Sequence, residues 1–490
     1  MKTHAMILGF ALILPSVPPV LGQPDRPPPD SRTRGAPRAT GPFAELSAKD
    51  ALKISDLRLV KVEPREEGGA KRINLTLDER DHEVRLMPFT MRAPDFQVLV
   101  QGDDGALKAI EPPAPLTFRG YLADEPQSQV AASMIDGRTY MTVLRANGEI
   151  WNVQPMGAGD VHVVYKSRDV LDSEWTCGSD ALPQLSPENN GANPGGVPEG
   201  AGPDGGGPRV ANRRCQIVFD TDVEFYQANG SSISATIADI EMIMNQVGLI
   251  FQNQVAISYY ETGLIVRTAI PQPYTSSIST NLICQFGENW NNNLPSFPRD
   301  VAHLFTGKDL EGSTVGLAWI GVICGGNFNN CNPAGSSLSY SLVQSRFSTT
   351  LALRVQDSAH ELGHNWNACH CNTGGNCGAG TSNPNNCGIM TSAISGGTTF
   401  DAAALSAITT LRDTATCLDG WENPTYVNWS YNGFSTGSLS QPWQTVGSGV
   451  YSALVGGEVR VQAGSYPENL TINKTLTINA MNGTVTVGTP

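Results

Sequence analysis

Histidine and basic side chains are scarce in this chain of 490 residues, and long apolar runs are missing. The 32 lysines and arginines are outnumbered by 46 acidic residues, which gives a formal net charge of −14 at pH 7. This acidic balance argues against nucleic acid or an anionic membrane as the main partner. After the N-terminal segment no stretch reaches the roughly 18 apolar residues of a membrane helix, so the sequence predicts no membrane span.

The N-terminus predicts export. Lys2 precedes an apolar run at residues 5–14, and Gly22 is a small residue before a plausible cleavage point. This order is typical of a secretory signal peptide, here residues 1–22. In an exported chain the 10 cysteines are expected to form disulfides. We therefore predict a secreted, extracellular protein.

Three of the only 7 histidines fall within residues 360–370. His360 and His364 are four residues apart and share one face of a predicted helix, where two imidazoles can bind one Zn²⁺. Glu361, beside the first histidine, can take a proton from a zinc-activated water. A catalytic zinc needs a third ligand, and His370 can supply it if the chain turns first. A left-handed Asn367 would help that turn.

Residues 360–370 read His-Glu-Leu-Gly-His-Asn-Trp-Asn-Ala-Cys-His and resemble the metzincin signature H-E-x-x-H-x-x-G-x-x-H. Asn367 stands where that family has glycine. Residues 387–390 resemble the Met-turn of the family, and the zinc motif is close to that of the adamalysin (reprolysin, ADAM-type) branch. The resemblance implies a zinc endopeptidase in which Met390 packs beneath the metal. It also implies that residues 391–400 line the pocket for the substrate side chain after the cut.

By the same resemblance, a glycine-rich stretch before the zinc helix forms the edge strand above the cleft. Its residues Gly316, Leu317, Ala318 and Trp319 would pair through their backbone with an extended peptide substrate. His303 is another potential metal ligand, but an isolated histidine is more often a structural residue.

The resemblance covers roughly residues 215–417, and we predict that residues 213–418 form the catalytic domain. Apolar residues recur every three or four positions in its expected helix at 232–254. Its predicted elements are a strand at 215–220, a helix at 232–254, a strand at 255–266, the zinc helix at 348–366 and a last helix at 401–412. The β-α-β opening indicates an α/β sheet.

Residues 43–184 contain short alternating runs that predict a β-rich module, and their position suggests a propeptide. The resemblance to metzincins implies that a propeptide cysteine can occupy the open zinc position of the zymogen, and Cys177 near the end of this module is the candidate. If Cys177 leaves with the propeptide, nine cysteines remain and one is unpaired. If Cys177 is in a disulfide, all ten can pair. Both alternatives stay open. The Gly/Pro-rich linker that follows is an accessible place for activation by proteolysis.

The composition shifts again after Trp421, towards glycine, serine, threonine and asparagine. The short runs at 470–472 and 476–478 resemble the opening coils of a right-handed parallel β-helix of the pectin-lyase type. A segment of that kind could bind polysaccharide or tether the protein to a cell surface.

The sequence therefore predicts a multidomain α+β protein. Its parts are a signal peptide (1–22), a disordered arm (23–42), a β-rich propeptide (43–184), a Gly/Pro-rich linker (185–212), a metzincin α/β catalytic domain (213–418) and a short parallel β-helix-like segment (421–490). The predicted function is that of a secreted, Zn²⁺-dependent endopeptidase, made as a zymogen, that acts on proteins or peptides. The alternative is a non-catalytic exported binding protein with a structural zinc. Glu361 favours the enzyme, because a structural zinc needs no base.

Overall fold

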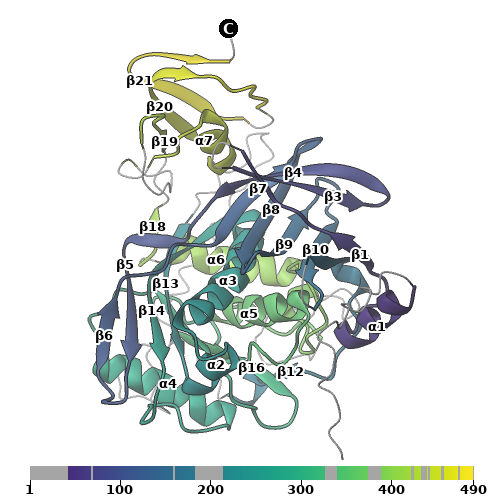
Figure 1. Cartoon of the computed structure of the whole chain (residues 1–490). Helices are drawn as coiled ribbons and strands as arrows, with labels where there is room; N and C mark the ends of the chain where they lie inside the picture. The colour runs from purple at the N-terminus through teal and green to yellow at the C-terminus, as the bar shows by residue number, and fades with distance from the viewer. Residues whose placement is uncertain are drawn as a thin grey trace, which may run out of the picture.

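The computed structural model of the chain (Figure 1) describes residues 42–67, 70–157, 160–182, 213–325, 331, 339–372, 388–415, 417–420, 424–431, 439, 442–453, 457–472 and 475–488. The predicted signal peptide and linker lie outside these residues. So does the predicted arm apart from Pro42. The side chains of Cys377 and Cys387 also lie outside them.

The first sheet is antiparallel and has the strand order β1-β11-β10-β9-β8-β7-β4-β3-β2. Its strands are β1 (Arg58–Lys61), β2 (Arg65–Glu67), β3 (Ala70–Leu77), β4 (Arg80–Pro88), β7 (Thr117–Leu122), β8 (Glu125–Ile135), β9 (Arg138–Leu144), β10 (Ile150–Pro155) and β11 (Val161–Lys166). In β4, His82, Val84 and Leu86 are buried in alternation with more exposed neighbours, as period-two patterning requires. Asp136 and Gly137 both have positive φ and make the tight turn between β8 and β9. The predicted β-rich module is present.

A helix precedes this sheet, where the sequence analysis expected strands from residue 43. It is α1 (Pro42–Leu52), with Glu45 in its first turn and Lys49 in its last. Proline at the first helical position and charges that complement the helix dipole stabilise such a start and end. The assignment of strand-like structure to these residues was wrong.

The second sheet has the order β12-β16-β17-β15-β13-β14-β5-β6, with β18 beside β13. Its strands are β5 (Arg92–Gln101), β6 (Leu107–Ile110), β12 (Thr176–Cys177), β13 (Arg213–Thr221), β14 (Ile257–Arg267), β15 (Val301–Phe305), β16 (Thr314–Ala318), β17 (Tyr340–Val343) and β18 (Asp419–Gly420). Three of them, β5, β6 and β12, come from the predicted propeptide. The two predicted regions therefore share one sheet.

Helices cover both faces of the second sheet. They are α2 (Val223–Ala228), α3 (Ile233–Val255), α4 (Ser279–Asn293), α5 (Leu351–Asn365) and α6 (Ala402–Thr414). Ile217 and Phe219 of β13 pack into the core that contains α3, α5 and α6, whereas Val218 packs into the core that contains α4. This alternation makes the predicted α/β arrangement, and the predicted helices and strands of its β-α-β opening are confirmed.

α3 lies between the two sheets (Figure 1). It is the one helix among the described residues that is long and apolar enough to cross a membrane, but 83% of the apolar window is buried inside the fold. Its apolar character therefore reflects packing on both sides. Ser232 caps its N-terminus by accepting a hydrogen bond from the amide of Ala235 at 3.3 Å.

The C-terminal segment forms a small third sheet of parallel strands, β19 (Thr425–Val427), β20 (Glu458–Tyr466) and β21 (Thr477–Val487), beside α7 (Val446–Ser452). Its core holds Val427, Trp443 and Val459. Parallel stacking agrees with the predicted opening coils, but three strands do not make a β-helix. The resemblance of this segment to the pectin-lyase type stays a prediction.

Disulfides join Cys284 to Cys331 and Cys324 to Cys417. Cys369 and Cys371 are also disulfide-bonded. Cys177 and Cys215 are free and buried. The alternative in which all ten cysteines pair is therefore wrong.

Candidate metal centre

The three histidines of the motif converge at the end of α5. Nε2 of His370 lies 3.1 Å from Nε2 of His360 and 3.2 Å from Nε2 of His364. On the other side of each ring, Nδ1 of His360 is 2.7 Å from the carbonyl of Ile389, and Nδ1 of His364 is 2.7 Å from the carbonyl of Ala368. A carbonyl only accepts, so these Nδ1 atoms carry the protons and both Nε2 atoms present lone pairs.

This arrangement fits a zinc ion. Ligand atoms held at about 2.0–2.1 Å around a tetrahedral zinc stand roughly 3.3 Å apart, close to the separations found here. Burial, reinforced by His370, lowers the pKa of His360 to about 3. Burial also lowers the pKa of His364 well below its usual value. Both rings are thus neutral at pH 7, which is the form that binds a metal.

The chain turns after α5 as the sequence analysis expected. Asn367 has φ +73°, so the predicted left-handed residue is confirmed. Its amide donates to the carbonyl of His364 at 2.8 Å, and the amide of Ala368 donates to Gly363 at 2.9 Å. These bonds close the helix end and bring His370 back towards it. The Asn367 side chain lies over Gly321, where an added Cβ would be 2.7 Å from its Oδ1.

Met390 ends a short turn of 3₁₀-helix, Gly388–Met390, and packs against Gly363 of α5. It is fully buried. A Cβ at Gly363 would be 2.6 Å from the sulfur of Met390, so Gly363 leaves the space that this side chain fills. The carbonyl of the preceding residue, Ile389, holds His360. The turn therefore orients His360 and also packs against α5.

Cys177 supplies a fourth potential ligand atom. Its sulfur is 3.5 Å from Nε2 of His364, and with the three histidines it forms a buried group whose ligand atoms all lie within 4.8 Å of one another. Burial and the nearby charge of Glu361 raise the pKa of the Cys177 thiol well above its usual range. A thiol in such a place ionises beside a cation such as zinc and otherwise stays protonated.

The residues around Cys177 lie between two walls, β16 on one side and residues 392–394 on the other. On one side, the amide of Thr176 donates to Ser313 at 2.8 Å and the amide of Gly178 donates to Gly316 at 2.9 Å, which makes β12 a parallel neighbour of β16. On the other side, the amide of Cys177 donates to Ser392 at 3.0 Å. The segment thus runs between the two walls as an added strand.

The edge-strand residues named from the sequence lie at this wall. Gly316, Leu317 and Ala318 belong to β16, and Trp319 follows it, buried to 2% exposure. Residues 392–394, which lie within the predicted pocket residues 391–400, provide the opposite wall. The amide of Ile394 donates to the carbonyl of Trp175, and Ala393 is the bridge partner of Thr176.

Glu361 is fully buried on the side of α5 that faces β16. Burial raises its pKa to about 8, although the Cys177 and Ser179 side chains act in the opposite direction. A Cβ at Gly316 would lie 2.3 Å from Oε1 of Glu361, so a glycine here leaves room for the carboxylate. Asp357, one turn earlier, also faces Gly316, and its carboxylate has no hydrogen bond with the described residues.

Ser179 and Asp180 also contact this centre, although the sequence alone did not single them out. The Ser179 hydroxyl lies 3.1 Å from the Cys177 sulfur and accepts a hydrogen bond from the Ala318 amide at 3.0 Å. Asp180 Oδ1 is 3.2 Å from Nδ1 of His370, which lowers the pKa of Asp180. The only signal in the sequence was their closeness to Cys177.

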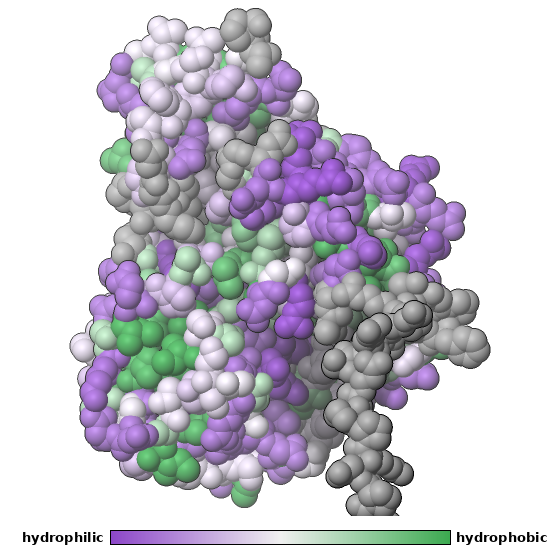
Figure 2. All heavy atoms as spheres, viewed as in Figure 1, coloured by the Kyte–Doolittle hydropathy of each residue, from purple (hydrophilic) through white to green (hydrophobic). Residues whose placement is uncertain are grey.

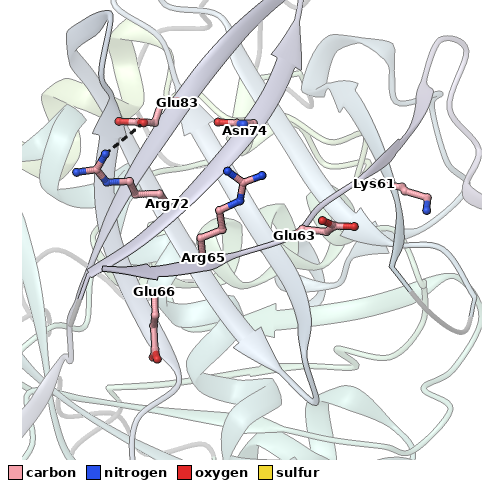
Figure 3. A pocket seen from close by; sticks show the side chains of 7 residues that line it. All are labelled: Lys61, Glu63, Arg65, Glu66, Arg72, Asn74 and Glu83. Carbon is pink, nitrogen blue, oxygen red and sulfur yellow. Dashed lines mark ion pairs between the residues drawn. The ribbon is translucent and has the colours of Figure 1, made fainter. Parts of the chain in front are cut away.

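His303 and a hollow on the first sheet are separate from this centre. His303 is buried, and its Nδ1 lies 2.7 Å from the Ser341 hydroxyl; burial lowers its pKa to about 3, as for a structural histidine. A hollow on the first sheet is lined by charged and polar side chains (Figure 3), in which Arg72 pairs with Glu83 at 3.5 Å. Among the described residues, its lining includes no histidine or cysteine.

Comparison with known proteins agrees with this geometry. Residues 211–402 match the reprolysin-type family model of metallo-peptidase family M12. The chain is also 25% identical over 273 residues to the zinc metalloproteinase-disintegrin-like atragin of Naja atra. That match covers 52% of this chain and 40% of the relative. The findings support a zinc metalloprotease of the reprolysin type.

Proposed function

We propose that this protein is a secreted zinc endopeptidase of the metzincin class, made as a zymogen, that hydrolyses proteins or peptides. The observation that carries the proposal is the convergence of His360, His364 and His370 beside Glu361, next to a strand, β16, that already pairs with an extended segment of chain. Secretion follows from the predicted signal peptide and agrees with the disulfides.

Each residue has a role in this proposal. His360, His364 and His370 hold the zinc, and the carbonyls behind the first two fix their orientation. When bound, Zn²⁺ supplies Lewis-acid polarisation of water and of the scissile carbonyl. Glu361 takes a proton from the attacking water and passes it to the leaving amine. The backbone of β16 holds the substrate as an added strand.

The zymogen part of the proposal is supported by residues 175–178. They lie where a peptide substrate would lie, bonded to β16 on one side and to residues 392–394 on the other. Cys177 places its sulfur beside the histidines. There it would occupy the position that the attacking water needs. The segment must leave before an external peptide can enter. Linker residues 185–212 are the proposed place of the activating cut.

The proposal is tested by metal removal and return. The full chain, cut in the linker and separated from its N-terminal segment, should hydrolyse casein and contain one zinc per molecule. A chelator should remove both the metal and the hydrolysis, and added Zn²⁺ should restore both. Zinc at full occupancy without hydrolysis of casein or of a mixed peptide library would favour the non-catalytic binding protein instead.

Replacement of Gly316 by alanine is expected to lower casein hydrolysis by about 10- to 100-fold, because the added Cβ displaces the Glu361 carboxylate. The clashes are with the ends of two side chains, Glu361 and Asp357, so the fold and the zinc content should persist. A Gly102→Ala chain is the control, since the nearest atom to a Cβ there is 3.5 Å away. Equal hydrolysis by both variants would show that Glu361 need not sit against β16.

A further inference from the structure

A row of polar side chains interrupts the apolar surface of α3 on the side that faces residues 43–182. Glu241, Asn245 and Gln246 are all buried. Each finds its partner in the predicted propeptide. Arg92 Nε donates to Glu241 at 2.5 Å, Arg119 Nε donates to Asn245 Oδ1 at 2.8 Å, and the Thr142 hydroxyl donates to Gln246. A core that never opens would be expected to be apolar here. An interface whose two sides separate can instead contain polar groups, because water solvates them once they are exposed.

β14 adds a backbone contact next to this row. β5 pairs with it in parallel, with Gln97 to Gln101 opposite Gly263 to Arg267. At the end of this ladder the Gln101 side chain donates to the carbonyl of Pro271 at 2.5 Å and accepts from Arg267. Figure 2 shows hydrophobic residues among hydrophilic ones in the region where Figure 1 draws β5, β6 and β14. The hairpin thus seals one edge of the second sheet.

Arg92 is the buried anchor of this contact. It pairs with Glu241 and stands beside Glu261 in the β5–β14 ladder, where the amide of Glu261 donates to Met91 at 2.8 Å. Its Nη1 also donates to the carbonyl of Pro113 at 2.6 Å. Glu261 is 1% exposed, and one of its carboxylate oxygens has no hydrogen bond among the described residues. Without Arg92, two neighbouring carboxylates would share a buried place with no cation between them.

This anchor is far from the metal centre. The order of the second sheet puts β16, β17, β15, β13 and β14 between β12, which carries Cys177, and β5, which carries Arg92. Six steps of about 4.8 Å separate the two by roughly 29 Å. The N-terminal region therefore holds the second sheet at both edges, and the two contacts share no residue.

We propose that the face formed by α3 and β14 is a second binding site for this chain's own residues 43–182, independent of the metal. The inference rests on the zymogen proposed above. Cutting the linker then leaves the N-terminal segment bound, and the cleft stays closed until the Arg92 contact and the β5 ladder separate. Activation needs a second event after the first cut, such as further proteolysis within the segment.

The test uses the full chain with a specific cleavage sequence placed in residues 185–212. After cutting, the wild-type pieces should elute together on size exclusion at micromolar concentration, with or without a chelator. Arg92→Gln should weaken retention on the order of 10²- to 10³-fold, as expected when one partner of a buried ion pair is removed. Arg58→Gln, which removes an exposed pair with Glu79, should retain the segment like the wild type.

Size exclusion reports retention from the size of the eluting complex and needs no measurement of activity. The test therefore works even for a chain that cleaves no casein. Separation of the wild-type pieces on cutting would overturn the inference without the need for any variant. So would release by the chelator alone, because the metal centre would then be the only contact that holds. An Arg92→Gln chain that does not fold would be recognised before the cut by the loss of its cooperative unfolding transition, and the wild-type result would decide.

Discussion

A Glu361→Gln chain, activated like the wild type, is expected to lose casein hydrolysis by a factor of about 10²–10⁴, the usual contribution of a positioned proton-transfer group. Glutamine keeps the shape of the side chain but cannot accept the proton. The three histidine nitrogens and their carbonyl partners are unchanged, so zinc content should stay at one per molecule. Hydrolysis rates and metal analysis on the same samples measure both quantities.

Glu288→Gln is the matched control for this variant. Glu288 lies exposed on α4, so removing its charge should leave hydrolysis and zinc unchanged. If Glu361→Gln lowers zinc content as much as it lowers hydrolysis, the residue supports the metal instead of moving a proton. If hydrolysis persists with zinc in place, another group serves as the base, and Asp357 on the same side of α5 would be the first to replace.

The local features of this centre could be predicted from the sequence because they depend on neighbouring residues. Histidines four apart share a helix face, and an asparagine at a helix end adopts the left-handed conformation that Asn367 has. The apolar spacing of residues 232–254 identified α3 almost to its ends. The same signals existed for α1, in Pro42 and Glu45, but the alternating runs that follow it were extended too far towards the N-terminus.

The partners of the edge strands could not be predicted. The pattern of residues 96–100 indicates a strand but not which strand pairs with it, because the ladder joins backbone groups that every residue has. β5 pairs with β14, more than 160 residues away, instead of joining the sheet that surrounds it in sequence. The sequence also could not predict whether Cys177 is a free thiol or part of a disulfide. Parity left two alternatives, and only the distance to His364 distinguishes a thiol at the metal centre from a disulfide.

Cys177→Ala in the uncut chain is expected to change the metal centre without opening the cleft. With cobalt in place of zinc, the wild-type chain should show a sulfur-to-metal charge-transfer band, and the variant should lack it. Casein hydrolysis by the uncut variant should nevertheless stay below about one hundredth of the activated enzyme, because the segment remains bonded to β16 and to residues 392–394. Each hydrogen bond contributes only about 0.5–1.5 kcal/mol, but they act together within one chain.

Cys215→Ala is the matched control, because Cys215 is the other free and buried cysteine and lies on β13. It should keep both the band and the latency. Full hydrolysis by uncut Cys177→Ala would mean that one thiol holds the enzyme inactive and that the strand contacts add little. A band that persists in Cys177→Ala would mean that a different sulfur reaches the metal. Loss of the band with latency intact would show that inhibition has two parts, a ligand at the metal and a strand paired with β16. The second part does not depend on the first, because the Arg92 contact holds the N-terminal segment far from the metal.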